Sequence, residues 1–383
     1  MKNTKVLIVG GGLVGLSIAW HLKKRGARPV ILESHAPAQE ASAAGAGMLP
    51  LHSVAFDTPE LYELNRLSYQ LYPSWAKELH RASGVDPEWE KSGSMGLLFS
   101  EVEEKNARTL SKRLEQLDMV VRWLNGREAR RREPALPKDV RKVMYLPETI
   151  QIRPSAICLT AVKAVGKAGV PIHSDEPVKS LVVRGGKIHG VKTGKRTIEA
   201  DAVVLATGAW APELLKPLGI DLPVYPIRGQ VLLLQGPLSG IKHILFATGY
   251  YIAPRRGGEL YVGSTLEKVG FDKSVTPEGI ATLATAARRM APTLSPLRVS
   301  GYFAGLRPGS VDGHPFLGKV PGTDGLFIAA GHHTHGHLLA AASGHLMTQL
   351  ILDGKTEMDL APFAVGRKPH ELQPPWWVKL AQN

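Results

Sequence analysis

The 383-residue sequence contains a single cysteine, only 6% aromatic residues and no long apolar run. Cys158 alone cannot form an intramolecular disulfide. No apolar stretch reaches the roughly 18 residues that a membrane-spanning helix needs. The net charge of +13 is accompanied by no zinc-finger spacing, no basic repeat and no aromatic-rich RNA-binding motif. We therefore expect no membrane span and no nucleic-acid partner, but either a solvated basic face or weak steering of anionic substrates.

What remains is the composition of an ordinary globular protein, with 44% hydrophobic and 21% charged residues. The length is sufficient for two domains with a core each. Met1 to Trp20 places lysines before an apolar run, as a signal peptide does, but no small-residue cleavage site precedes a polar mature start. We therefore expect a cytoplasmic protein.

The stretch from Lys5 to Glu33 has the pattern of a strand, a helix and a second strand. Val6 to Val9 is an apolar, β-branched run typical of a buried parallel strand. Leu16 to Arg25 continues at helical spacing, and Pro29 to Leu32 predicts the next strand. This order of elements is that of a nucleotide-binding βαβ unit.

Three glycines between the first strand and the helix complete the dinucleotide-binding pattern. Gly10 makes the tight turn, Gly12 lets a pyrophosphate approach the backbone, and Gly15 lets helix and strand pack closely. The helix N-terminus offers N–H groups to the phosphates. Glu33 lies where it would bind a ribose 2′-hydroxyl and repel the 2′-phosphate of NADP. The unit predicts NAD or FAD and does not choose between them.

The later chain predicts a different architecture. Strand-like runs at Gln230 to Leu234, Tyr250 to Pro254 and Glu259 to Ser264 indicate an antiparallel sheet. The apolar strand Asp201 to Leu205 runs into a small turn that contains Gly208, which would lay backbone against the same nucleotide. Beyond the first unit, helices are predicted at five places, the first with an internal Pro73 that should kink or split it: 59–83, 101–117, 154–167, 277–290 and 336–352.

Taken together, seven segments resemble the D-amino-acid oxidase superfamily of FAD enzymes, most closely its bacterial glycine oxidase and sarcosine oxidase branch. They are GGGLVG with Glu33, ASAAGAGM, VVLATGAW, YYIAPR, YVGST, AGLRPGSVDGHPFLG and GLFIAAGHHTHGHLLAAASG. The resemblance runs from about Lys5 to Gly354. It implies an α/β fold with a Rossmann-like FAD-binding domain and an α+β substrate domain built on an antiparallel sheet.

The resemblance also implies discontinuous domains. The expected FAD-binding domain comprises residues 1–84, 146–222 and 302–365. The expected substrate domain comprises 85–145 and 223–301, and 366–383 form a C-terminal tail.

Cofactor contacts are implied residue by residue, in addition to the motif positions Gly10, Gly12, Gly15 and Gly208. The FAD-contacting residues would be Leu13, Val14, Glu33, Ser34, Ala41, Ser42, Ala46, Gly47, Met48 and Val178, with His332, His333, Thr334, His335, Gly336, His337 and Leu338 along the flavin. Covalent sarcosine oxidases attach FAD through a cysteine in the segment that here reads Ala304-Gly305-Leu306. We therefore expect noncovalent FAD.

Substrate contacts follow from the same resemblance. Arg307 matches the arginine that pairs with the substrate carboxylate, and Tyr251 matches the tyrosine whose hydroxyl shares it. A planar guanidinium binds a carboxylate bidentately, which suits this role. A structural loop arginine is the alternative for Arg307. Tyr250 competes with Tyr251, because strand alternation would place only one of the two on the substrate face.

Three further pocket positions depart from the family or stay open. Thr334 replaces a second arginine typical of glycine oxidases, and Leu266 replaces a methionine. Met48 either packs passively near the flavin or shapes the substrate pocket. The changes make the site less positive, so sarcosine or another small or secondary amino acid is as consistent with the sequence as glycine.

The histidines of His332 to His337 also invite a metal-site interpretation. Zinc needs three or four ligands that converge tetrahedrally, whereas side chains crowded around a strand-to-helix turn point in several directions. We therefore expect no metal at this segment.

The predicted reaction is FAD-dependent oxidative deamination of glycine, sarcosine or a small D-amino acid. A hydride passes from the α-carbon to the flavin, and O2 reoxidises the flavin to give H2O2. A D-amino-acid or cyclic-amine dehydrogenase that passes electrons to a quinone or carrier is the nearest alternative. A NAD-dependent dehydrogenase and a noncatalytic flavoprotein are two others, and a homo-oligomer is left open.

Overall fold

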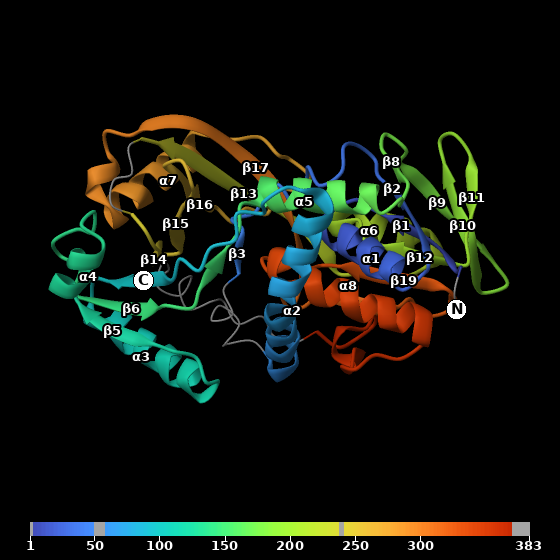
Figure 1. Cartoon of the computed structure of the whole chain (residues 1–383), viewed down its shortest axis with the longest axis horizontal. Coiled ribbons are helices and arrows are strands. Elements are labelled where there is room, and N and C mark those ends of the chain that lie inside the picture. The colour runs from blue at the N-terminus through green and yellow to red at the C-terminus, as the bar shows by residue number, and fades with distance from the viewer. Residues whose placement is uncertain (1–2, 50–57, 237–240, 370–383) are drawn as a thin grey trace.

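The computed structural model describes residues 3–49, 58–236 and 241–369, so most of the expected C-terminal tail lies outside the described residues. The chain forms two lobes side by side (Figure 1). One lobe contains the N-terminal unit with α1 and α8, and the other contains a large sheet that carries α7 on one face.

The first lobe is built on a six-stranded sheet in the order β18-β19-β12-β1-β2-β8. All neighbouring strands are parallel except β18 and β19. The predicted strand at Val6 to Val9 therefore lies inside a parallel sheet, where both of its faces are buried. The bounds are β1 Lys5–Val9, β2 Arg28–Leu32, β8 Ile172–His173, β12 Ala202–Leu205, β18 Phe316–Lys319 and β19 Leu326–Ala330.

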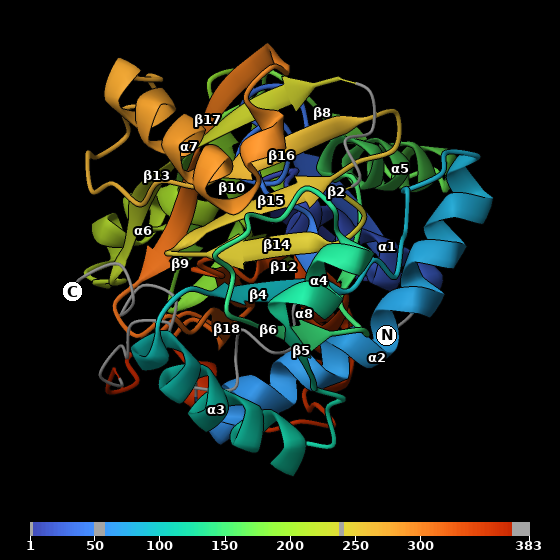
Figure 2. The same cartoon turned by 90° about the vertical axis from the view of Figure 1, so that its left-hand side faces the viewer.

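Four helices share one apolar core with one face of this sheet. They are α1 Leu13–Lys24, α2 Pro59–Ser83, α5 Pro154–Lys167 and α8 Gly336–Asp353. Pro73 does not split α2, although the helix changes direction along its length (Figure 2). The other face of the sheet packs against β9 Val178–Arg184, β10 Lys187–Thr193, β11 Thr197–Glu199 and α6 Ala211–Leu215.

Gly15 allows α1 to pack directly on the turn that follows β1. A Cβ at Gly15 would lie 2.1 Å from the carbonyl oxygen of Gly10, closer than any real contact. Gly10 itself has φ +104°, a conformation that L side chains rarely adopt. The helix N-terminus is thereby held at the carboxyl end of the parallel strands, where nucleotides bind in such sheets.

The second lobe is built on an eight-stranded sheet in the order β17-β13-β16-β15-β14-β4-β6-β5. Its pairs are antiparallel except β14 with β4. The predicted antiparallel sheet is present, and the structure adds the pairing of its central strands with the segment near residue 95. The bounds are β4 Ser94–Leu98, β5 Arg122–Asn125, β6 Lys142–Leu146, β13 Val224–Gln235, β14 Ile244–Ala247, β15 Tyr250–Pro254, β16 Glu259–Gly263 and β17 Arg298–Ser310.

One face of this sheet is covered by α7, Pro277–Met290, and the neighbouring core. The opposite face carries Tyr251, Ala253 and Tyr261, which pack with Met48 of the first lobe. The remaining elements are β3 Met48–Leu49, β7 Ile150–Gln151, α3 Glu101–Gln116, α4 Gly126–Arg132, η2 Gly208–Trp210, η3 Lys216–Leu218, η4 Pro292–Leu294 and η5 Ala361–Phe363.

Strand β17 is longer than the pattern around Arg307 suggested. It runs across the expected domain boundary at residue 302 and pairs along its length with β13. Arg307 therefore lies in a strand, opposite Ile227, and is not a loop residue. The expected domain boundaries stay a prediction. None of the helices in the described ranges is long and apolar enough to cross a membrane.

Candidate active site

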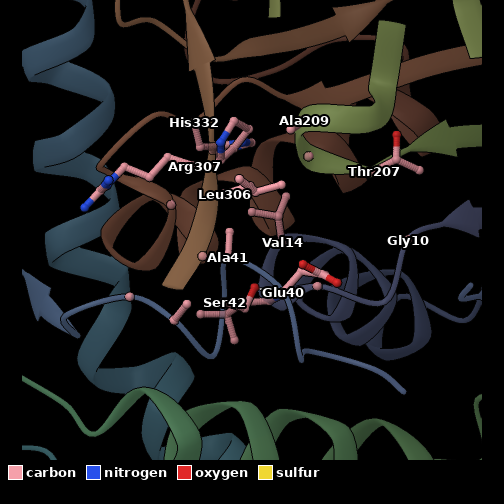
Figure 3. A pocket seen from close by; sticks show the side chains of 18 of the residues that line it. Gly10, Val14, Glu40, Ala41, Ser42, Thr207, Ala209, Leu306, Arg307 and His332 are labelled. Atoms are coloured by element: carbon pink, nitrogen blue, oxygen red, sulfur yellow. Dashed lines mark hydrogen bonds between the residues drawn. The ribbon is translucent and has the colours of Figure 1, made fainter. Parts of the chain in front are cut away.

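A cavity of ≈ 790 Å³ lies between the two sheets. Its wall combines the turn after β1, the segment from Glu33 to Met48, the turn around Thr207 and the start of α8 with strands of the larger sheet. In Figure 3, Gly10 and Thr207 lie at one end and the Arg307 side chain extends away from them. The volume is near the upper end of the roughly 300–1,000 Å³ usual for ligand pockets, so the cavity accommodates a large ligand.

The end near Gly10 has unused hydrogen-bonding capacity. Gly12, the N-cap of α1, offers no side chain to the helix N–H groups, and the hydroxyl of Ser42 accepts the Leu13 N–H at 2.9 Å. The buried Thr207 Oγ1 has no hydrogen-bond partner among the described residues. N–H groups at a helix N-terminus with an unsatisfied hydroxyl nearby suit a phosphate-containing ligand.

Glu33 is held at the cavity wall by three short bonds. Its Oε2 accepts the Gly11 N–H at 2.7 Å. Its Oε1 accepts the Ser34 hydroxyl at 3.0 Å and the His35 N–H at 3.1 Å. The carboxylate is thus fixed at the end of β2, as binding of a ribose hydroxyl requires.

Arg307 lies at the other end and forms hydrogen bonds only to neutral groups of the described chain. Its guanidinium donates to the Thr265 carbonyl at 3.1 Å and to Ser264 Oγ at 2.5 Å. A Cβ at Gly229 would lie 2.1 Å from Arg307 Nη1, so the guanidinium occupies the space that a glycine leaves on β13. Burial lowers the pKa of Arg307, and no carboxylate of the described residues opposes that effect. Its charge is left for a ligand.

Tyr251 lies beside Arg307, and its hydroxyl forms a hydrogen bond with Ser264. Burial raises the pKa of Tyr251, so the phenol stays protonated at neutral pH. Tyr250 also lines the cavity, although it packs against the core on the α7 side. The two tyrosines thus lie on opposite faces of the sheet, as strand alternation predicts, although both line the cavity.

The cavity thus has an end with free N–H groups and a fixed carboxylate, and an opposite end with a cation. Comparisons with known proteins show the family. The family described as DAO, FAD dependent oxidoreductase, matches residues 5–350. The chain belongs to this FAD-dependent oxidoreductase family.

Individual relatives are similar over nearly their full length. A glycine oxidase of Pseudomonas aeruginosa is 33% identical over 369 residues, covering 94% of this chain and 98% of the relative. The crystal structure of glycine oxidase from Geobacillus kaustophilus superposes with a TM-score of 0.92 at 32% identity, covering 97% and 100% of the two chains. Iminodiacetate oxidase from a Chelativorans species has a TM-score of 0.86 at 27% identity, covering 94% and 98%. The expected fold and an FAD-dependent amino-acid or amine oxidase are confirmed at this level.

Most residues expected to contact FAD line the cavity. They are Gly10, Gly12, Leu13, Val14, Glu33, Ser34, Ala41, Ser42, Ala46, Gly47, Met48, Val178, Gly208, His332, His333, Thr334, His335, Gly336 and His337. Gly15 and Leu338 do not. Gly15 faces the Gly10 carbonyl, and Leu338 is buried in the helix core, where its carbonyl accepts the Ser68 hydroxyl.

Four histidines between β19 and the first turn of α8 are neutral at pH 7. Burial lowers the pKa of His332, His333 and His337 to about 4 and that of His335 to about 3. His337 Nε2 is buried without a partner in the described chain and faces the cavity. Among the described residues no group of three or more His, Cys, Asp or Glu side chains is arranged to hold a metal ion.

The predicted pocket residues surround the Arg307 end. Met48, Leu266 and Thr334 all line the cavity, and the Leu266 side chain is half exposed. Met48 also packs with Tyr251, so it lies at the boundary of the two lobes.

The sequence patterns missed several cavity residues. Gly229 and Ser264 support Arg307 from neighbouring strands, and only strand pairing reveals this. Lys273 and Glu40 form an ion pair of 2.8 Å across the cavity wall. A glycine inside the apolar run of β13 was the one local signal, since strand glycines often mark a close approach.

Proposed function

We propose that the chain oxidatively deaminates glycine, sarcosine or a small D-amino acid and uses O2 as the electron acceptor. The products would be a 2-oxo acid, ammonia or a primary amine, and H2O2. The observation that carries the proposal is Arg307, a partly buried cation whose hydrogen-bond partners in the described chain are neutral, placed in the cavity of an FAD-dependent enzyme. The names of the similar glycine oxidases support the same substrate class.

The Arg307 and Tyr251 side chains would both bind and orient the substrate. The Arg307 fork would bind the carboxylate through two charge-assisted hydrogen bonds. The protonated Tyr251 hydroxyl would donate a further bond to the same carboxylate. Together they would fix which face of the α-carbon meets the cofactor.

The residues around the cavity fit FAD. The start of α1 and Thr207 would hold the diphosphate, Glu33 the ribose, and the segment His332 to His337 the flavin. When bound, FAD supplies the two-electron acceptor chemistry, so no dedicated side-chain base is needed to oxidise a neutral amine.

We also propose that FAD is held noncovalently. Ala304, Gly305 and Leu306 carry no thiol. Cys158 is buried in α5, away from the cavity wall, and burial raises the pKa of its thiol to about 12. Such a thiol is a poor nucleophile at neutral pH.

A substrate panel scored by peroxide release tests the function. Glycine, sarcosine, small D-amino acids and cyclic amines are offered to the FAD-loaded enzyme in aerated buffer. Peroxide from at least one small amino acid is expected. Turnover with an artificial dye but none with O2 would contradict the proposed oxidase activity and indicate a dehydrogenase.

A further inference from the structure

Arg255 is a buried arginine directly after β15, four residues beyond Tyr251. Its Nη1 donates to Gln151 Oε1 at 2.7 Å. Its Nη2 donates to the carbonyl oxygen of Ala46. Both acceptors lie on the side of the cavity that the first lobe forms. Ala46 lines the cavity, and Gln151 pairs with Met48 between β3 and β7.

The charge of Arg255 has no carboxylate partner among the described residues. The acids nearby, Glu88 and Glu259, pair with Arg153 at 2.9 and 2.8 Å. The Arg255 guanidinium lies 4.9 Å from the ring centroid of Tyr261, and its Nε is buried without a partner in the described chain. Burial lowers the pKa of Arg255 to about 10, so the side chain stays charged at neutral pH.

Burying such a cation costs stability, because desolvation is not offset by an opposite charge. A methionine or leucine could fill the same space without this cost. Only a planar guanidinium can donate two hydrogen bonds at once to two fixed acceptors in this geometry. The fork joins the strand that carries Tyr251 to the segment Ala46–Met48, which lines the cavity and packs against the same tyrosine.

We propose that Arg255 is a positioning residue for the reaction. Its fork fixes the cavity-lining segment 46–48 relative to β15, and so aligns the bound cofactor with the substrate that Arg307 and Tyr251 hold. The part of this inference that concerns the substrate rests on the proposed function. The part that concerns the cofactor rests only on FAD binding.

The test compares Arg255→Lys with a matched control, Arg256→Met. Lysine keeps the charge but cannot donate to both acceptors in the fork geometry. Arg256 is the neighbouring arginine, about half exposed, and pairs with Asp86 and Glu90 on the surface. Each variant is studied as apoprotein titrated with FAD and as the FAD-loaded enzyme, well below its melting temperature.

For Arg255→Lys we expect a severalfold higher Kd for FAD and a flavin reduction rate at saturating substrate that falls by about tenfold or more, since small misplacements are costly. KM should stay within about threefold, because Arg307 and Tyr251 are untouched. Gln151→Ala, which removes one acceptor, should change the same quantities in the same direction. Arg256→Met should match the wild type.

Wild-type values for Arg255→Lys would overturn the proposal, because the charge alone would then suffice. A lower melting temperature with unchanged FAD affinity and reduction rate would also overturn it, since the role would be purely structural. If the wild type oxidises no amino acid, the proposed function fails, and the FAD affinities of Arg255→Lys and Arg256→Met alone decide the inference: a difference supports it, and equal affinities overturn it.

Discussion

The position of the Arg307 guanidinium depends on small, uncharged neighbours. Its hydrogen bonds to Thr265 and Ser264 hold the guanidinium without neutralising it. Gly229 leaves open the space that the guanidinium fills. A charge-assisted hydrogen bond contributes about 1.5–3 kcal/mol, so under the proposed function the placement of this one group would decide how well the substrate carboxylate binds.

Gly229→Ala tests this placement at the residue scale. The new Cβ would displace the end of a flexible side chain, so stability should change little. Loss of the carboxylate contact, about 1.5–3 kcal/mol, should raise KM by about 10–100-fold. Steady-state kinetics and urea unfolding measure the two effects.

The control is Gly301→Ala, where a Cβ would meet Leu233 at an ordinary 3.4 Å. Its kinetics should equal those of the wild type. An unchanged KM in Gly229→Ala would show that Arg307 does not hold the substrate from this position.

Among the elements, helix α1 carries the nucleotide end of the site and depends on contact with β1. Its first residues line the cavity, while Gly15 rests on the Gly10 carbonyl. The position of the helix N-terminus, and therefore of its N–H groups, is set by a contact that tolerates no added atom.

Gly15→Ala should push α1 away from the turn. We expect a loss of about 1–3 kcal/mol in the free energy of unfolding, the usual cost of overpacking. FAD affinity should fall as well, because the helix N-terminus moves. Gly166→Ala is the matched helical control, since nothing lies within 4 Å of its added Cβ. It should gain about 0.4–1 kcal/mol. Equal behaviour of the two variants in urea unfolding and FAD titration would contradict this packing account.

Sequence patterns within a short stretch predicted several helices and strands correctly. The strand at Tyr250–Pro254 and the helices at Pro154–Lys167 and Pro277–Met290 have the predicted bounds. The full lengths of β13 and β17 were not predicted, because each contains a proline, Pro226 or Pro308, and these two pair with each other. Only long-range pairing shows that neither proline interrupts the sheet.

The same distinction holds for the site. The glycine turn and Glu33 follow from spacing within one βαβ unit. Arg307 and Tyr251 were expected from family resemblance, because nothing local separates a substrate-binding arginine from a structural one. Gly229, Ser264 and Arg255 act through contacts between strands far apart in sequence. No pattern along the chain reveals those contacts.

At the scale of the whole molecule, four histidines between β19 and the first turn of α8 link stability to pH. His332, His333, His335 and His337 have a pKa of about 3 to 4 in the folded chain, against about 6.5 when unfolded. Below pH 6.5 the unfolded chain binds protons that the folded chain does not. Their contribution is therefore fully present above about pH 6.5 and is lost as the pH falls towards 4.

Urea unfolding of the apoprotein at pH 7.5 and pH 5.5 should show a lower midpoint at the acidic pH. His332→Gln should weaken this dependence, because it removes one buried imidazole, whereas His189→Gln, at an exposed position, should leave it unchanged. A pH-independent midpoint would mean that these imidazoles do not titrate differently on folding.

The most direct measurement of the central claim is anaerobic reduction of the bound flavin, followed by its visible absorbance. Glycine, sarcosine and dimethylamine, an analogue of sarcosine that lacks the carboxylate, are titrated into the FAD-loaded wild type and into Arg307→Leu. We predict that sarcosine or glycine bleaches the wild-type flavin, that dimethylamine does not, and that Arg307→Leu needs about 100-fold more amino acid, equivalent to about 3 kcal/mol. Equal bleaching by the amine and the amino acid, or unchanged substrate affinity in Arg307→Leu, would contradict the account.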